Sequence, residues 1–214
     1  MRWFSELLLR RQLRKAARCR LGEAPENTLV RVSGRVHGFE SNLLEAPLSG
    51  RLCVYYSVSI QEMRGSDLIN AGAAAYLFGT KTRGPVMASQ QDAISFVLED
   101  AGERAVIDPA EARISVGFDH VTRSKAAFDA SPRQLALLRS HDLIRRNWFN
   151  TVEVEYREGV LELGQAIVVH GGGRREPDPE RPQSSAGRDC AATRLRFTSA
   201  PRAPLVISHD PKSE

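Results

Sequence analysis

The sequence predicts an α+β fold that is mainly β: an antiparallel curled sheet or a small OB-like barrel, with an N-terminal helix and one inserted helix. The chain has 214 residues, of which 42% are hydrophobic, enough for a packed core in one large domain or two small ones. From Leu29 onwards, short alternating or β-branched runs are separated by turn residues, which is typical of strands. The first twenty residues instead combine strong helix formers with no Gly or Pro.

The predicted N-terminal helix, residues 1–21, is strongly basic. Apolar residues recur at near-helical spacing between Phe4 and Ala17, and Gly22 and Pro25 end the segment. Its basic side chains are Arg2, Arg10, Arg11, Arg14, Lys15, Arg18 and Arg20. Against Glu6 these seven give a net charge of +6, whereas the whole chain carries +4, so the remaining residues are slightly acidic. The positive charge therefore belongs to one terminal segment and not to the β body.

Such a helix has two interpretations, and the sequence leaves both open. It could pack on its own domain or pair in an oligomer, with its arginines in solvent. Alternatively it could lie on an anionic membrane surface or dock on an acidic protein partner. The residues expected to make that contact are Trp3, Phe4, Arg10, Arg11, Arg14, Lys15 and Arg18. Nucleic acid is the least favoured partner, because the β body has no positive excess and only 7% of the residues are aromatic.

The β body is predicted to extend over residues 29–210. Candidate strands cover 29–38, 53–62, 93–100, 103–108, 112–118, 150–158, 165–171, 193–199 and 204–210. One helix interrupts them, where Ser131 can cap, Pro132 fits the first turn, and leucines follow up to Leu143. Residues 171–194 are rich in Gly, Pro, Ser and charge and predict a flexible excursion, and residues 71–79 fit either a loop or a short helix.

No cofactor or metal site is predicted. Cys19, Cys53 and Cys190 lie far apart, and the histidines show none of the spacings typical of zinc ligands. No apolar run approaches the roughly 20 residues that cross a bilayer. We therefore expect a cytoplasmic protein that does not span the membrane, with peripheral membrane attachment through residues 1–20 as one option.

No catalytic residue is predicted either. Asp119 and His120 are adjacent and are followed by Ser124 and Lys125, but neighbours on a strand point to opposite faces. The glycines after His170 could cradle a phosphate, but they lack the lysine, the hydroxyl residue and the helix of a P-loop. Of Tyr55 and Tyr56, one is expected in the core and the other facing solvent or a covering loop.

Four segments, in order, resemble the GIDE domain of membrane-bound RING ubiquitin ligases. In the first, a glycine-containing strand leads to a Pro-x-x-Gly turn and a Cys-Val-x-Tyr strand: Gly34, Pro47, Gly50, Cys53, Val54 and Tyr56. The second carries Phe96, Leu98, Asp100, Gly102, Val106, Asp108 and Pro109. The third carries Tyr156, Glu158, Leu163, Gly164 and Gly171, and the last carries Pro204, Leu205, Ile207 and Ser208. The resemblance spans residues 29–210, and most of these residue types are fold determinants.

The resemblance implies a membrane-adjacent domain that binds a substrate or partner. The sequence lacks the zinc-binding RING and the transmembrane helices of the ligases, so ubiquitin ligase activity is not expected. We therefore predict a non-catalytic protein-interaction or ligand-binding module, with membrane-peripheral adaptor function as its most specific form. The alternatives are an enzyme whose site assembles from dispersed residues such as Asp119, His120 and His170, and an OB-like nucleic-acid binder.

Overall fold

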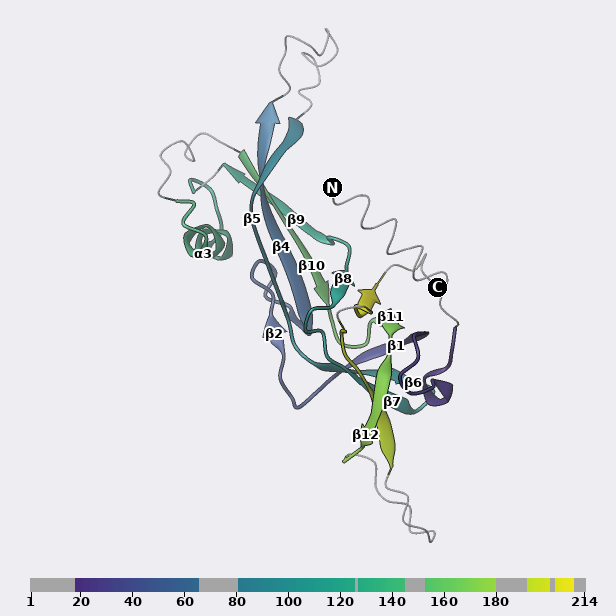
Figure 1. Cartoon of the computed structure of the whole chain (residues 1–214). Helices are drawn as coiled ribbons and strands as arrows, with labels where there is room; N and C mark the ends of the chain where they lie inside the picture. The colour runs from purple at the N-terminus through teal and green to yellow at the C-terminus, as the bar shows by residue number, and fades with distance from the viewer. Residues whose placement is uncertain are drawn as a thin grey trace.

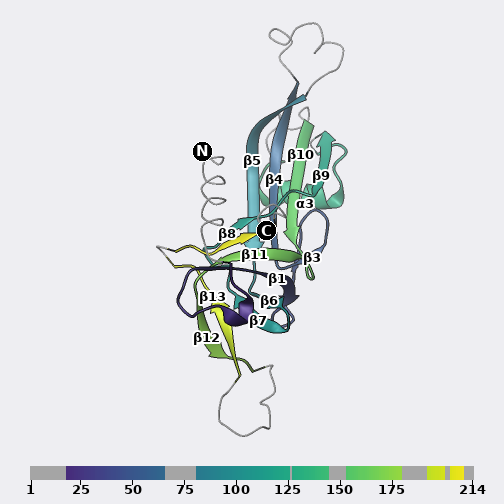
Figure 2. The same ribbon diagram turned by 90° about the vertical axis from the view of Figure 1, so that its right-hand side faces the viewer.

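The computed structural model describes residues 18–65, 81–125, 127–144, 153–179, 192–200 and 203–209. In this part of the chain the fold is mainly β, as the sequence predicts. It has two large sheets in place of the single predicted sheet or barrel, a short two-stranded sheet, one α-helix and one 3-10 turn. The molecule is elongated, with one large sheet following the other along its length (Figure 1 and Figure 2).

The larger sheet has eight strands. In spatial order they are β12 (Gly173–Pro177), β13 (Thr193–Phe197), β7 (Glu103–Ile107), β6 (Phe96–Asp100), β1 (Val30–Gly38), β11 (Ala166–Gly171), β14 (Val206–Ser208) and β8 (Arg113–Ser115). All pairings are antiparallel except β13 with β7 and β14 with β8. Among the described strands, β12 and β8 lie at the two edges of this sheet and do not pair with each other. The sheet is therefore curled and not a closed barrel.

The smaller sheet has four antiparallel strands and determines where the candidate site lies. Its order is β5 (Lys81–Ala93), β4 (Tyr55–Gly65), β10 (Glu153–Leu161) and β9 (His120–Lys125). Nine consecutive residue pairs join β10 to β4 without a register shift. A two-stranded sheet of β2 (Leu44–Glu45) and β3 (Leu52–Cys53) precedes β4.

Two hydrophobic cores share strands β4 and β10. Tyr55 and Leu161 belong to the core of the eight-stranded sheet, whereas Tyr56 and Val160 belong to the core between the four-stranded sheet and the helix. Both tyrosines are buried, at 4% and 6% exposure. One tyrosine was expected in the core and the other facing solvent or a covering loop. The second part of this expectation is wrong, because the start of β4 has a hydrophobic core on each of its two sides.

Helix α3 (Pro132–Ser140) begins where the sequence predicts. Ser131 caps it: the Ser131 hydroxyl accepts from the Gln134 backbone N–H while the Gln134 side chain accepts from the Ser131 backbone N–H. Leu137 and Leu138 are buried in the second core, and α3 lies beside one face of the four-stranded sheet (Figure 1). The Gln134 amide also donates to the Thr122 hydroxyl on β9 at 3.0 Å, which fixes the helix to an edge strand.

Four strands were not predicted: the two-residue β2, and β5, β9 and β12. β5 contains Gly84, Pro85 and a run of polar residues, which is unusual within a strand but tolerated on an edge strand with register shifts near Gln61. β9 lies outside the candidate strands, of which the nearest ends at residue 118. β12 and the start of β13 occupy the described ends of the predicted 171–194 excursion and pair with each other over five residues. The middle of that excursion and the 71–79 segment lie outside the described residues.

The predicted N-terminal helix falls mostly outside the described residues, which begin at Arg18. Arg18 forms a parallel bridge with Arg31, and the Cys19 N–H donates to the Arg31 carbonyl at 3.0 Å. Because this backbone pairs with β1, residues 18–20 are not helical, and the helix prediction to residue 21 is wrong for its last residues. A 3-10 turn, η1 (Leu21–Glu23), follows and buries Leu21. In the described segments there is no helix of the length and apolarity needed to cross a bilayer.

Candidate functional site

The four-stranded sheet has one apolar face and one polar face. Alternate residues of β4 and β10, including Val58, Ile60, Val154 and Tyr156, pack toward α3. Because side chains alternate along a strand, the intervening residues share the opposite face. Along one row across the strands these are Arg123, Glu155, Gln61 and Val86, and along the next row Val121, Arg157, Ser59 and Ser89. This second face is therefore built from polar side chains with few large apolar groups.

Glu155 lies at the centre of the polar face and is fully buried. The Nε of Arg83 donates to its Oε1 at 3.0 Å, and Arg123 donates to its Oε2 through Nε at 3.0 Å and Nη2 at 2.8 Å. Arg157 is the third cation, with its Nε 3.9 Å from Oε1. We call these four residues, Arg83, Arg123, Arg157 and Glu155, the arginine cluster. One carboxylate serves three guanidinium groups, so the cluster carries a positive excess.

Arg157 differs from the other two arginines in its surroundings. Its side chain is 26% exposed, compared with 55% for Arg83 and 51% for Arg123. Its guanidinium stacks on the Phe118 ring at 4.5 Å from the centroid. The Arg157 Nε is buried and has no hydrogen-bond partner. Arg157 is thus held in place with hydrogen-bonding capacity unused, which is uncommon for a buried polar atom.

A glycine allows the chain segment carrying Phe118 to cross the sheet. A Cβ at Gly159 would lie 2.3 Å from the carbonyl oxygen of Gly117, which is closer than atoms can approach. Glycine at this position of β10 lets the 117–118 segment pass directly over the strand. The Phe118 ring is thereby positioned against Arg157, which occupies the β10 position two residues before Gly159.

The electrostatics of the cluster reflect its charge imbalance. Burial acts to raise the pKa of Glu155, but hydrogen bonds from Arg123 and Arg83 outweigh it and hold that pKa below the ordinary value. For Arg157, burial and then repulsion from Arg83 lower the pKa, and attraction to Glu155 opposes them only in part. Glu155 is therefore ionised at neutral pH, and the cluster as a whole would be stabilised by a further anion.

A second buried carboxylate, Glu158, holds the turn that precedes β3. It accepts hydrogen bonds from the Leu48 N–H at 2.7 Å, from the Ser49 N–H at 3.1 Å, and from the Ser49 hydroxyl. Next to it, Arg51 donates to both oxygens of Asp119 at 2.7 and 2.8 Å. These bonds tie the turn to the start of β9, so Glu158 and Asp119 have structural partners.

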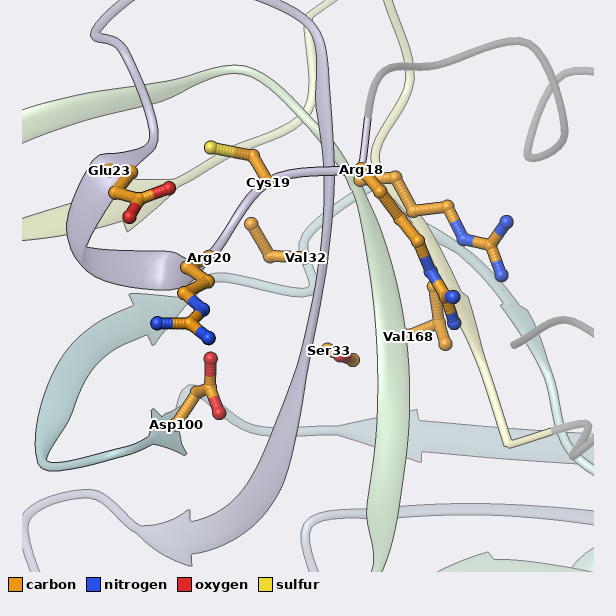
Figure 3. A pocket seen from close by; sticks show the side chains of 9 residues that line it. Arg18, Cys19, Arg20, Glu23, Val32, Ser33, Asp100 and Val168 are labelled. Atoms are coloured by element: carbon orange, nitrogen blue, oxygen red, sulfur yellow. The ribbon is translucent and has the colours of Figure 1, made fainter.

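Of the residues predicted to bind a membrane or partner, only Arg18 lies in the described part of the chain. Trp3, Phe4, Arg10, Arg11, Arg14 and Lys15 are outside it. Arg18 is exposed and lines a cavity of about 310 Å³ together with Cys19, Arg20, Arg31 and Asp100. Figure 3 shows the Arg20 guanidinium and the Asp100 carboxylate pointing toward one another, with Arg18 directed away from them.

The residues named for an assembled catalytic site come from different sheets. His120 begins β9 and Asp119 directly precedes it, whereas His170 lies on β11 opposite Arg31. Burial and then the charge of Arg31 lower the pKa of His170. Ser124 is buried with its hydroxyl 3.0 Å from that of Tyr156, while Lys125 is exposed, so the two point to opposite faces of β9.

The glycines after His170 form strand ends and not a phosphate cradle. Gly171 ends β11 and Gly173 begins β12, and the Arg175 N–H donates to the Glu26 carboxylate at 3.2 Å. Among the residues that the structure describes, no group of three or more His, Cys, Asp or Glu side chains could hold a metal ion.

The sequence does not reveal the arginine cluster, because its members are far apart in the chain. Arg83 and Glu155 are 72 residues apart, and Arg123 and Glu155 are 32 apart. The one local signal is the alternation of Glu153, Glu155 and Arg157 with Val154 and Tyr156, which indicates a strand with one polar face. Comparisons of the chain with protein-family models, curated proteins and solved structures find no match.

Proposed function

We propose that the chain is a non-catalytic interaction module that binds a protein partner through the polar face of its four-stranded sheet. The observation that carries the proposal is the arginine cluster: three guanidinium groups placed by strand register around one buried carboxylate, with Arg157 only partly paired. Rigid strands hold these side chains, and arginine is a residue type enriched where proteins bind one another.

The resemblance to the GIDE domain adds to this proposal. The Pro-x-x-Gly turn of the first matching segment is held by Glu158 of the third, through the backbone N–H groups of Leu48 and Ser49. The matching residues are therefore suited to shaping the domain and leave its surface to select the partner. In the ligases the domain lies next to the membrane, and we propose the same position for this chain.

A photo-crosslinking experiment tests the proposed surface. A benzoylphenylalanine is introduced in place of Ser89, an exposed residue of β5 on the polar face, and in a matched variant in place of Ala110, which is exposed in the turn after β7. We expect irradiation in the native host cell to give a discrete protein adduct from position 89 and none from position 110. The same adducts at both positions, or none at position 89, would overturn the proposal.

The peripheral membrane attachment is proposed for the basic segment, residues 1–20. Its support is the net charge of +6 within twenty residues, next to an otherwise slightly acidic chain. Arg18, the described member of the predicted contact set, is exposed. The test is co-sedimentation of the full chain with phosphatidylserine and with phosphatidylcholine vesicles, comparing the wild type with a variant in which Arg10, Arg11, Arg14 and Lys15 are glutamine. Binding to anionic vesicles that survives these substitutions would contradict this role.

A further inference from the structure

We infer that the arginine cluster recognises carboxylate side chains, so that the partner of the polar face is a protein segment rich in aspartate or glutamate. The inference rests on the proposed function and adds the chemistry of the partner.

The charge of the arginine cluster is complementary to that of a carboxylate. Arg83 and Arg123 use their Nε groups on Glu155, and their side chains remain 55% and 51% exposed. Arg157 lies 3.9 Å from the same carboxylate and is 26% exposed. A guanidinium presents a planar fork that matches a carboxylate through two parallel hydrogen bonds. A second carboxylate placed beside Arg157 and Arg83 would meet the exposed parts of both side chains and reduce the repulsion between these two arginines.

The cluster already binds one carboxylate, that of Glu155. Glu155 accepts from Arg123 at 3.0 and 2.8 Å, so the spacing of the strands suits a carboxylate held between guanidinium groups. Neighbouring strands lie about 4.8 Å apart, and the residues of the cluster come from β5, β10 and β9. An acidic segment that crosses these strands could present successive carboxylates to Arg83, Arg157 and Arg123.

The surroundings of the cluster favour a protein segment over other polyanions. Single-stranded nucleic acid binds by stacking bases on aromatic rings, and the Phe118 ring is already covered by Arg157. Membrane surfaces are bound with large apolar side chains beside the cations. Among the described residues of the polar face, the exposed large apolar side chains are Val86 on β5 and Val121 on β9, which are the two edge strands. They suit the apolar side chains of a peptide that lies across the sheet.

The test measures fluorescence anisotropy of a labelled decapeptide of alternating glutamate and serine with the full chain. We expect salt-sensitive binding that Arg157→Gln weakens at least tenfold, and weaker or no binding of the corresponding glutamine–serine peptide. Arg139→Gln is the matched control, because it removes the same charge from an exposed position on α3, across the sheet from the cluster. It should change the affinity less than twofold. Arg83→Gln, at a 55% exposed side chain, gives a second variant should Arg157→Gln perturb the fold.

Each other outcome overturns the inference in a recognisable way. Equal weakening by Arg157→Gln and Arg139→Gln would indicate a response to net charge alone. Arg157-dependent binding of phosphatidylserine vesicles in place of the peptide would identify the polar face as a membrane contact. If the peptide fails to bind while the position 89 adduct still forms, the carboxylate chemistry is wrong and the proposed function stands. If that adduct is also absent, both are wrong.

Discussion

Replacing Glu158 with glutamine should destabilise the fold by about 3 kcal/mol, because the Glu158 carboxylate accepts three hydrogen bonds in a buried position. Glutamine retains one acceptor oxygen, but its NH2 group is a donor and would face some of the N–H and O–H groups that now donate to Glu158. Hydrogen bonds to a charged group contribute roughly 1.5–3 kcal/mol each, and a buried donor left unpaired costs roughly 1–3 kcal/mol. The loss of one such bond and the weakening of the others give the expected total.

The measurement is urea unfolding followed by circular dichroism and by tryptophan fluorescence, with the free energy of unfolding taken by linear extrapolation. The matched control is Glu162→Gln. Glu162 is 34% exposed and lies 3.5 Å from Arg51, a partly exposed contact that should contribute about 0.5 kcal/mol or less. A Glu158→Gln protein within 0.5 kcal/mol of the wild type, or one no less stable than Glu162→Gln, would refute the reasoning.

Three further predictions follow from single residues. Folding lowers the pKa of Glu155, so the ionised Glu155 stabilises the fold fully above pH 4.5, its ordinary pKa, and this contribution is lost as the pH falls further. In urea unfolding measured at a series of pH values, Glu155→Gln should therefore reduce the fall in the free energy of unfolding below about pH 4.5. Burial, with nearby carboxylates, raises the pKa of the Cys53 thiol to about 11. Mass spectrometry after iodoacetamide treatment at pH 8 should therefore find Cys19 modified in the folded protein and Cys53 modified only after unfolding. Gly159→Ala should lower the melting temperature by several degrees through its clash with a crossing carbonyl, whereas Gly38→Ala, with open space at its Cβ, should shift it little.

Local patterns predicted much of the fold. The alternation in residues 29–38 and 165–171 corresponds to β1 and β11, which pair with each other, and Ser131–Pro132 marks the start of α3. β5 was missed because its polar sequence with Gly84 and Pro85 lacks the alternation of a half-buried strand. Its place in the sheet comes from pairing with β4, which is a tertiary interaction. The burial of both Tyr55 and Tyr56 was missed for the same reason, since it requires a second core that no local pattern reveals.

The candidate site depends still more on register than the fold does. Arg123 faces Glu155 because β9 and β10 are paired one residue to one residue, and Arg83 reaches Glu155 across β4 after two register shifts in β5. A slip of one residue in either edge strand would move its arginine to the α3 side, where Val154 and Tyr156 are buried. The Gln134–Thr122 hydrogen bond and the buried Ser124–Tyr156 contact both fix β9 from that apolar side. The packing that stabilises one face of the sheet therefore positions the charges on the other face. Substitutions in α3 should affect the proposed binding at the arginine cluster only when they alter the register of β9.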